Sequence, residues 1–233
     1  MNIAIVGAGL MGRLLALSIL RGKQSESVSI TLFDKDNKLA HNSAAYAAAG
    51  LLTPLGESLH CEPNIVSMGF ESLRLWPALL GSLDEYTLFQ QAGAIMVSHE
   101  QDKGDYQRFV RHLNNNYPEH EQHTLDRAQL LELEPEIGRS FNQGLYLPQE
   151  GQIGNRRLLI ALRKQLEKEG ESSNGVNSLN WLSECQVFAI ENTDLNSKVS
   201  YQQCGITCSQ TFDLVIDCRG TGASGKNSHS ACA

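Results

Sequence analysis

The sequence lacks any apolar run long enough to cross a bilayer as a helix, so we expect no membrane span. It also lacks an excess of positive charge, because 26 acidic residues outnumber 19 lysines and arginines and the net charge is −7. No basic cluster offsets this balance, which argues against nucleic acid as a partner. The N-terminus has no basic region followed by a long apolar region. We therefore expect no signal peptide and a cytoplasmic location.

Paired cysteines are absent as well. No two of the six cysteines form a C-x-x-C motif, and Cys204 and Cys208 stand four residues apart without a nearby histidine. That spacing is a poor match to metal-ligand patterns, so no metal site is expected. We expect reduced, mostly structural thiols. The remaining composition is that of an ordinary globular protein, long enough for one large domain or two small ones.

The most informative segment is the N-terminal one. An apolar run at residues 2–6 leads into Gly7-Ala8-Gly9-Leu10-Met11-Gly12, and a leucine-rich helical stretch follows. A second apolar run, residues 28–33, ends at Asp34, 22 residues after Gly12. Strand, glycine turn, helix, strand and acid in this order are typical of a dinucleotide-binding unit. The apolar face expected for the helix consists of Leu14, Leu15, Leu17, Ile19 and Leu20.

The chemistry of a dinucleotide explains this spacing. Gly7 permits a tight turn, Gly9 allows a diphosphate to approach the backbone, and Gly12 lets the helix pack close to the sheet. The helix N-terminus presents free N–H groups and a partial positive charge to the phosphates. The Asp34 carboxylate can accept hydrogen bonds from ribose hydroxyls and disfavours a 2′-phosphate, so NADP is not expected. The alternative is an ordinary crossover with glycines in a turn.

The rest of the chain alternates between helical and extended patterns. We expect helices at 63–80, with Met68, Leu73, Leu75, Trp76 and Leu79 in the core, at 105–116, and from a cap at Asp126 to 134. Asn155 is predicted to cap a helix through 168, with Leu158, Leu159, Ala161, Leu162 and Leu166 on its apolar side.

Extended segments are expected around Gly93, especially at 94–97, and at 144–148, 181–191, 198–204 and 212–218. The segments 181–191 and 198–204 are expected to be antiparallel. Residues 169–180 are expected to form a polar loop. Residues 42–54 are rich in small side chains, which indicates a backbone lying against something flat or bulky. An alanine-rich helix ending near Gly50 or Pro54 is the alternative.

At this point the chain resembles the FAD-dependent amine and amino-acid oxidoreductases of the D-amino-acid oxidase type, closest in pattern to glycine oxidase. The likeness rests on the N-terminal fingerprint, Asp34, and the small-residue segment ending in Ala49-Gly50-Leu51-Leu52-Thr53-Pro54. It continues through Gly151-Gln152-Ile153-Gly154-Asn155-Arg156-Arg157-Leu158-Leu159, Cys185-Gln186-Val187, and residues 212–220.

The resemblance implies a set of FAD contacts. Gly7, Gly9, Leu10, Met11 and Gly12 would lie at the diphosphate, with Asp34 and Lys35 at the adenosine ribose. Asn42 and Ser43 would lie on the phosphate side, and Ala49, Gly50 and Leu51 by the flavin. The backbone of Val187 would meet the adenine, and Gly220 and Gly222 would let the chain pass near the cofactor. Val187 as a simple core valine, and Asn42 with Ser43 as a helix cap, are the alternatives.

Two departures from the family pattern bear on function. Cys218-Arg219 replaces a small apolar pair, and Arg219 is either a surface residue or a phosphate contact. That variant is also similar to members that mature a quinone cofactor in a partner enzyme. Family members continue for another hundred residues or more, including an arginine that clamps the substrate carboxylate. The resemblance therefore implies a fragment or a truncated product, and leaves the catalytic residues unknown.

The predicted fold class is α/β, with a Rossmann-like FAD-binding domain and an incomplete α+β substrate domain. Residues 1–56 and 148–223 would form the FAD-binding domain, 57–147 the substrate domain, and 224–233 a disordered tail. The predicted activity is oxidation of the C–N bond of an amino acid or small amine by hydride transfer to flavin N5. A NAD-dependent dehydrogenase, a maturation factor and an inactive fragment are the alternatives. The predicted partner is a small-molecule substrate, and binding to another protein or formation of a homo-oligomer is also compatible with the sequence.

The predicted reaction needs little acid–base help beyond a deprotonated amine, and no catalytic triad is evident. The seven histidines show no spacing that suggests a site. Glu57 and His60 follow the small-residue segment and are candidates for an active cavity, with a surface loop as the alternative.

Overall fold

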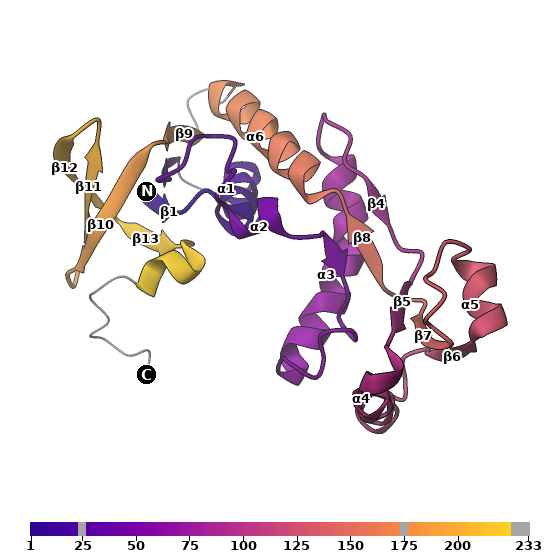
Figure 1. The fold of residues 1–233 in the computed structure, drawn as a ribbon. Helices are drawn as coiled ribbons and strands as arrows, with labels where there is room; N and C mark the ends of the chain where they lie inside the picture. Colours follow the sequence, from indigo (N-terminus) through magenta and orange to yellow (C-terminus); the bar gives the residue numbers. More distant parts are fainter. Residues whose placement is uncertain (23–26, 173–176, 225–233) are drawn as a thin grey trace. The chain divides into compact units, whose positions relative to one another are not determined.

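The computed structural model describes residues 1–22, 27–172 and 177–224. Contacts between residues divide the chain into two compact units (Figure 1). Unit 1 comprises Met1–Ala49, Leu83–Tyr86 and the chain from Asn155 onward, and unit 2 comprises Gly50–Ser82 and Thr87–Gly154. Each unit is described by itself below.

Unit 1 is built on a parallel sheet of four strands in the order β13-β1-β2-β9. These are β1 (Asn2–Val6), β2 (Val28–Phe33), β9 (Asn177–Leu182) and β13 (Leu214–Asp217). Ile3 to Val6 are all buried, as are most residues of β2, which is typical of inner parallel strands covered on both faces. The predicted strand–turn–helix–strand unit and the α/β class are confirmed.

The helix after the glycine turn, α1 (Leu10–Arg21), buries only Leu17 of the five predicted apolar residues. Its buried residues are Gly12, Arg13, Ala16 and Leu17, whereas Leu14, Leu15, Ile19 and Leu20 are only partly covered. Small residues at positions 12 and 16 allow close packing against the sheet. The leucines at 14 and 15 therefore lie beside the contact rather than in it.

The second large helix of unit 1, α6 (Asn155–Ser172), packs against α1 and β9. Its predicted apolar residues, Leu158, Leu159, Ala161, Leu162 and Leu166, are all at most 1% exposed, so this prediction is confirmed. The polar loop expected at 169–180 is wrong, because α6 continues to Ser172 and β9 begins at Asn177. Gly170 lets α6 approach β9 closely, since a Cβ there would stand 3.1 Å from Leu179 Cβ.

A second sheet of unit 1 is an antiparallel meander of β10 (Cys185–Asn192), β11 (Ser197–Gln203) and β12 (Ile206–Phe212). Cys204 and Gly205 form the two-residue turn before β12, and both have positive φ, as a type I′ hairpin requires. The antiparallel pairing of the first two strands is confirmed, but the sequence analysis missed β12 and assigned Trp181, a β9 residue, to β10.

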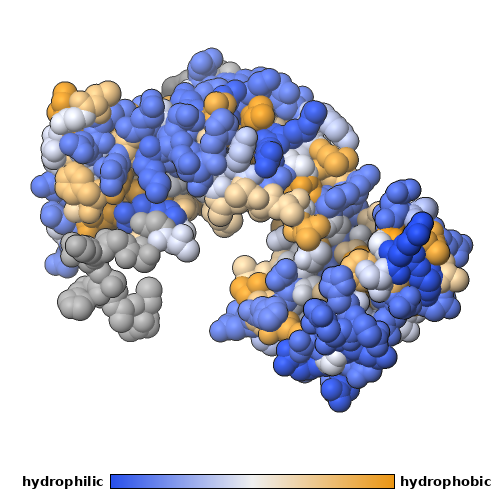
Figure 2. Space-filling view, in the orientation of Figure 1, coloured by the Kyte–Doolittle hydropathy of each residue, from blue (hydrophilic) through white to orange (hydrophobic). Residues whose placement is uncertain are grey.

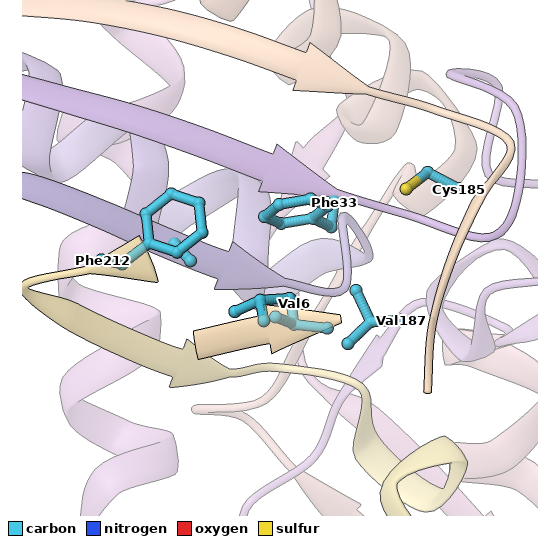
Figure 3. Packing of buried hydrophobic residues seen from close by; sticks show 7 residues of the cluster. Val6, Phe33, Cys185, Val187 and Phe212 are labelled. Carbon is cyan, nitrogen blue, oxygen red and sulfur yellow. The ribbon is translucent and has the colours of Figure 1, made fainter. Parts of the chain in front are cut away.

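The meander and the parallel sheet share one apolar core (Figure 3). Phe33 at the end of β2 contacts Phe212 edge-to-face, with ring centroids 5.8 Å apart, and Tyr201 at 5.1 Å. Val6, Cys185 and Val187 complete the labelled cluster. This core fixes the carboxyl ends of β1 and β2, from which the glycine turn and Asp34 extend.

Unit 2 contains two antiparallel three-stranded sheets, ordered β3-β8-β4 and β5-β7-β6. The strands are β3 (Leu51–Leu52), β4 (Phe89–Gln90), β5 (Ala94–Val97), β6 (His123–Asp126), β7 (Gln143–Leu147) and β8 (Gly151–Ile153). Its α-helices are α3 (Pro63–Gly81), α4 (Lys103–Asn116) and α5 (Arg127–Leu133). All three helices were predicted within two residues, and Asp126 caps α5 in a capping box.

The core residues predicted for α3 are partly wrong. Leu73 is buried, and Trp76 and Leu79 are half-buried, but Met68 is 62% and Leu75 50% exposed. Apolar patches over α3 are visible on the surface (Figure 2). Helical periodicity identified the helix here, but several apolar residues lie on its exposed face.

The compact units divide the chain near 49/50 and 154/155, whereas the predicted domains divide it near 56/57 and 147/148. The difference arises because β3 and β4 pair with β8, which places residues 50–56 and 148–154 in unit 2. The assignment of FAD binding to one part and substrate binding to the other stays a prediction. The predicted disordered tail lies, apart from Ser224, outside the described residues. Within the described ranges no helix is long and apolar enough to span a membrane.

Candidate functional site

The glycine turn between β1 and α1 requires two of its three glycines for steric reasons. Gly7 has φ +105°, and a Cβ there would lie 2.8 Å from the Cys218 carbonyl carbon and oxygen. A Cβ on Gly12 would lie 1.9 Å from the Gly7 carbonyl oxygen. The turn therefore packs against the end of β13 on one side and against α1 on the other. No larger residue fits at either position without moving backbone.

Gly9 differs from the other two, because the described residues leave open space beside it. A Cβ on Gly9 would have only Ser43 Cβ nearby, at 4.0 Å. Gly9 is also the N-cap of α1 and supplies no side-chain cap, so the N–H groups of the first turn are left for another acceptor. Leu10 is half-buried and Met11 is 67% exposed at this end of the helix. An open approach to free N–H groups fits the diphosphate of an adenine dinucleotide.

Asp34 connects the end of β2 to the glycine turn. Its Oδ2 accepts a hydrogen bond from the Ala8 amide, and its Oδ1 accepts one from the Asp36 amide at 2.7 Å. An ionised carboxylate has about four acceptor positions, so roughly two stay available for ribose hydroxyls. Lys35 beside it is exposed. The predicted ribose ligand is thus half-buried next to the turn and also fixes the turn's conformation.

The segment after Asp34 is held by a second carboxylate, which the sequence analysis missed. Asp36 Oδ2 accepts from the Asn42 amide at 2.9 Å. Ser43 then caps the short helix α2 (Ala44–Ala47) by accepting from the Tyr46 amide at 3.2 Å. The helix-cap alternative therefore holds for Ser43. Contact of Asn42 and Ser43 with a phosphate stays a prediction.

The start of α6 holds α2 in place and explains part of the Gly151–Leu159 motif. The Asn155 amide nitrogen donates to the carbonyls of Ala45 and Ala48. Arg156 Nε donates to the Tyr46 carbonyl at 3.1 Å, and its guanidinium stands 4.8 Å from the Tyr46 ring centroid. The prediction that Asn155 is the N-cap is wrong, because α6 begins at Asn155 itself and the side chain binds α2.

The three residues that are predicted to lie beside the flavin belong to different compact units. Ala49 is exposed and ends the first segment of unit 1. Gly50 is buried in unit 2 with φ +81°, and Leu51, 63% exposed, begins β3. Their role beside a flavin stays a prediction.

The remaining predicted contacts lie near the meander and the end of β13. The Val187 side chain is 8% exposed and belongs to the unit 1 core, so the core-valine alternative holds for its side chain, while the predicted contact concerns its backbone. Gly220 has φ +59° and begins the 3₁₀ turn η2 (Gly220–Ser224), which includes Gly222.

Arg219 forms an ion pair with Asp217, with Nη2 2.6 Å from Oδ2. The hydrogen bond to Arg219 lowers the pKa of Asp217 and raises that of Arg219. This pairing fixes the guanidinium at the end of β13. A contact of Arg219 with a phosphate stays a prediction.

Two buried charged groups were missed by the sequence analysis. Arg13 on α1 is only 1% exposed. Glu150 in unit 2 is fully buried, and its Oε1 accepts from the amides of Leu55 and Gly56, each at 2.8 Å. Glu57 and His60 are both exposed, as the surface-loop alternative requires. Within the described ranges no cluster of metal-binding side chains occurs.

Comparisons with known proteins identify the family. The model of the family described as "DAO: FAD dependent oxidoreductase" matches residues 2–228. A glycerol 3-phosphate dehydrogenase from Caloramator mitchellensis is 26% identical over 230 residues, covering 94% of this chain and 42% of that protein. The bifunctional protein ThiO/ThiG from Trichormus variabilis is 27% identical over 178 residues, covering 74% and 25%.

Among solved structures, glycine oxidase from Geobacillus kaustophilus has the same fold, with a TM-score of 0.72 and 21% identity. The match covers 93% of this chain and 54% of that one, so the chain spans about half the length of this relative and less than half of the two above. The family model covers nearly the whole chain, and the glycine turn with Asp34 lies where a Rossmann-like cofactor domain has its nucleotide site. The chain therefore belongs to the DAO family of FAD-dependent oxidoreductases.

Proposed function

We propose that this chain binds FAD through unit 1 and serves an oxidoreductase that breaks the C–H bond next to the nitrogen of an amino acid or small amine. The observation that carries the cofactor part is the open glycine turn joined to the Asp34 carboxylate by the Ala8 amide. The family match supports FAD over a nicotinamide cofactor.

Bound FAD supplies a hydride acceptor at flavin N5 and a route for the two electrons to a terminal acceptor. The substrate carbon would give up hydride and its nitrogen a proton to solvent, so that a C=N bond forms. Water would then hydrolyse the imine to a carbonyl compound and ammonia or a smaller amine. The residues of this chain would bind and orient the cofactor. Free N–H groups at the start of α1 would hold the diphosphate, Asp34 would hold the ribose, and the Asn155–Arg156 pair would fix the segment that leads to Ala49.

The likeness in fold to glycine oxidase supports an amine substrate. The glycerol 3-phosphate dehydrogenase relative supports a second candidate, oxidation of an alcohol carbon in a phosphorylated polyol. Both reactions remove hydride from a carbon that carries a heteroatom, so the same cofactor site serves either. Reduction of the bound flavin by each candidate substrate therefore distinguishes the two reactions.

The test uses the full chain. The protein is purified and its spectrum is examined for flavin absorption near ~450 nm, with added FAD if the isolated protein is colourless. Glycine, N-methylglycine, a panel of D- and L-amino acids, and glycerol 3-phosphate are then added separately without oxygen. Bleaching by an amine supports the proposal, and bleaching by glycerol 3-phosphate alone supports the second candidate. Flavin that stays oxidised with every amine contradicts the C–N chemistry but leaves the cofactor assignment intact.

A further inference from the structure

Among the residues that the structure describes, Arg13 is the largest fully buried one, and its charge lies inside unit 1. Three of its nitrogens donate to three backbone carbonyls: Nε to Ala8 at 2.7 Å, Nη1 to Leu159 at 2.6 Å, and Nη2 to Lys38 at 3.0 Å. The Trp181 ring centroid lies 5.1 Å from the guanidinium carbon. A planar fork of donors on one rigid group makes these three bonds possible at once.

The three carbonyls belong to the segments that surround the candidate nucleotide site. Ala8 lies inside the glycine turn, between Gly7 and Gly9. Lys38 lies between Asp34, the predicted ribose ligand, and Asn42, on the predicted phosphate side. Leu159 lies on α6, whose first residues hold α2. One side chain therefore links the turn, the 34–43 segment and α6.

Arg13 has no carboxylate within ion-pair distance in the part of the chain that the structure describes. Burial, together with repulsion from Arg163, lowers the pKa of Arg13 to about 10. Attraction to Asp34, Asp36 and Glu167 offsets part of this shift, and the group stays charged at neutral pH. A buried charge without a close counter-ion is costly, and apolar residues of similar volume often stabilise a fold as well or better. The buried guanidinium is thus better explained by the arrangement of the three segments that it holds than by a contribution to the stability of the fold.

We propose that Arg13 is a positioning residue of the adenine-dinucleotide site, which sets the distance between the glycine turn and the 34–43 segment before any ligand binds. Its positive charge, left without a close carboxylate, also favours an anionic diphosphate at the turn. This inference rests on the proposed binding of FAD. It concerns ligand affinity and not the chemical step.

The test compares Arg13→Lys and Arg13→Met with Arg21→Met. This control removes an ion pair between Arg21 and Glu169 at the other end of the same helix, away from the glycine turn and the 34–43 segment. Calorimetry gives the dissociation constants of ADP, adenosine and FAD, and circular dichroism checks folding. We expect both Arg13 variants to bind ADP at least ~10-fold more weakly, as expected when hydrogen bonds to a charged group are lost. In Arg13→Met the loss for ADP should exceed the loss for adenosine. The control should match the parent.

The outcomes separate this inference from the proposed function. If the parent binds neither ADP nor FAD, the proposed function fails. If the parent binds both and folded Arg13 variants bind them within ~2-fold, or if ADP and adenosine weaken equally in Arg13→Met, the inference about Arg13 is overturned. If the variants do not fold, hydrogen exchange on the ligand-free parent decides: the amides of 36–43 must be as protected as those of the turn, and free exchange there overturns the inference.

Discussion

Asp34 combines two tasks in one carboxylate, because it fixes the Ala8 amide of the glycine turn and leaves acceptor positions for a ribose. We predict that Asp34→Asn weakens FAD binding about 10- to 100-fold, the loss of one or two charge-assisted hydrogen bonds. Fluorescence titration with FAD measures this. Asp213→Asn is the matched control, because Asp213 is exposed and its carboxylate accepts from the Asn2 amide at the other end of β1. Equal affinities in the two variants would falsify the role of Asp34.

Glu150 is a fully buried carboxyl of unit 2. Its Oε1 accepts two backbone amides, while its buried Oε2 has no hydrogen-bond partner in the described part of the chain. Burial raises the pKa of Glu150 to about 7, although the hydrogen bonds from the two amides act in the opposite direction and lower it. At neutral pH the group is therefore divided between its protonated and ionised forms. A protonated Oε2 explains why a buried oxygen tolerates the absence of a donor.

The shift in the pKa of Glu150 predicts a pH dependence with a definite sign. Between its ordinary value of 4.5 and about 7 the unfolded chain releases the proton and the folded chain keeps it. Stability from this group is thus complete below pH 4.5, falls as pH rises to about 7, and is then constant, with a loss on the order of 3 kcal/mol. Glu150→Gln should remove this slope. Urea unfolding from pH 4.5 to 8 measures it.

A clean readout of the Glu150 effect is available. Trp76 in α3 belongs to unit 2, so Trp181→Phe leaves a single tryptophan that reports on the unit containing Glu150. Glu132→Gln is the control, because Glu132 on α5 is an exposed carboxyl of the same unit. Parallel pH profiles for the parent and Glu150→Gln would show that Glu150 titrates normally, contrary to the prediction.

At the scale of elements, two glycines of the turn between β1 and α1 have different roles. Gly12 is required for packing, and Gly9 leaves space for a ligand. Gly12→Ala should prevent α1 from packing, because its Cβ would overlap the Gly7 carbonyl. Gly9→Ala should leave the ligand-free protein within about 1 kcal/mol of the parent, since a weaker N-cap is offset by a stiffer unfolded chain. It should nevertheless reduce FAD affinity, because the new methyl group occupies open space at the turn.

Thermal unfolding and FAD titration of the two glycine variants test this separation. The expected pattern is a folded Gly9→Ala protein with weak FAD binding and a destabilised Gly12→Ala protein. A Gly9→Ala protein with parental affinity would mean that no ligand approaches the turn closely at that residue. A stable Gly12→Ala protein would contradict the packing argument.

The same elements indicate how far sequence reasoning reaches. The glycine turn, Asp34 and α6 were predictable because each depends on local spacing that a nucleotide or a helix period imposes. Arg13, Asp36 and Glu150 were not, because their partners are backbone groups of segments far away in the chain or in loops without a pattern. The Cys204-Gly205 hairpin was missed because positive φ at a cysteine has no clear sequence signal.

At the scale of the whole molecule, the chain carries one tryptophan in each compact unit, Trp181 in unit 1 and Trp76 in unit 2. Every residue predicted at the diphosphate or the adenosine, from Gly7 to Ser43 and at Val187, belongs to unit 1. A ligand that lacks the flavin should therefore stabilise unit 1 directly. Unit 2 should respond only as far as its unfolding is coupled to that of unit 1.

We predict that ADP raises the unfolding free energy reported by Trp181, in a Trp76→Phe variant, by about 2.7 kcal/mol at a concentration 100 times its dissociation constant. The transition reported by Trp76, in a Trp181→Phe variant, should move much less, because no predicted ADP contact lies in unit 2. Urea unfolding followed by tryptophan fluorescence, with and without ADP, measures both. Equal shifts at the two tryptophans would mean that the units unfold together. A shift only at Trp76 would place the nucleotide in unit 2 and overturn the site described above.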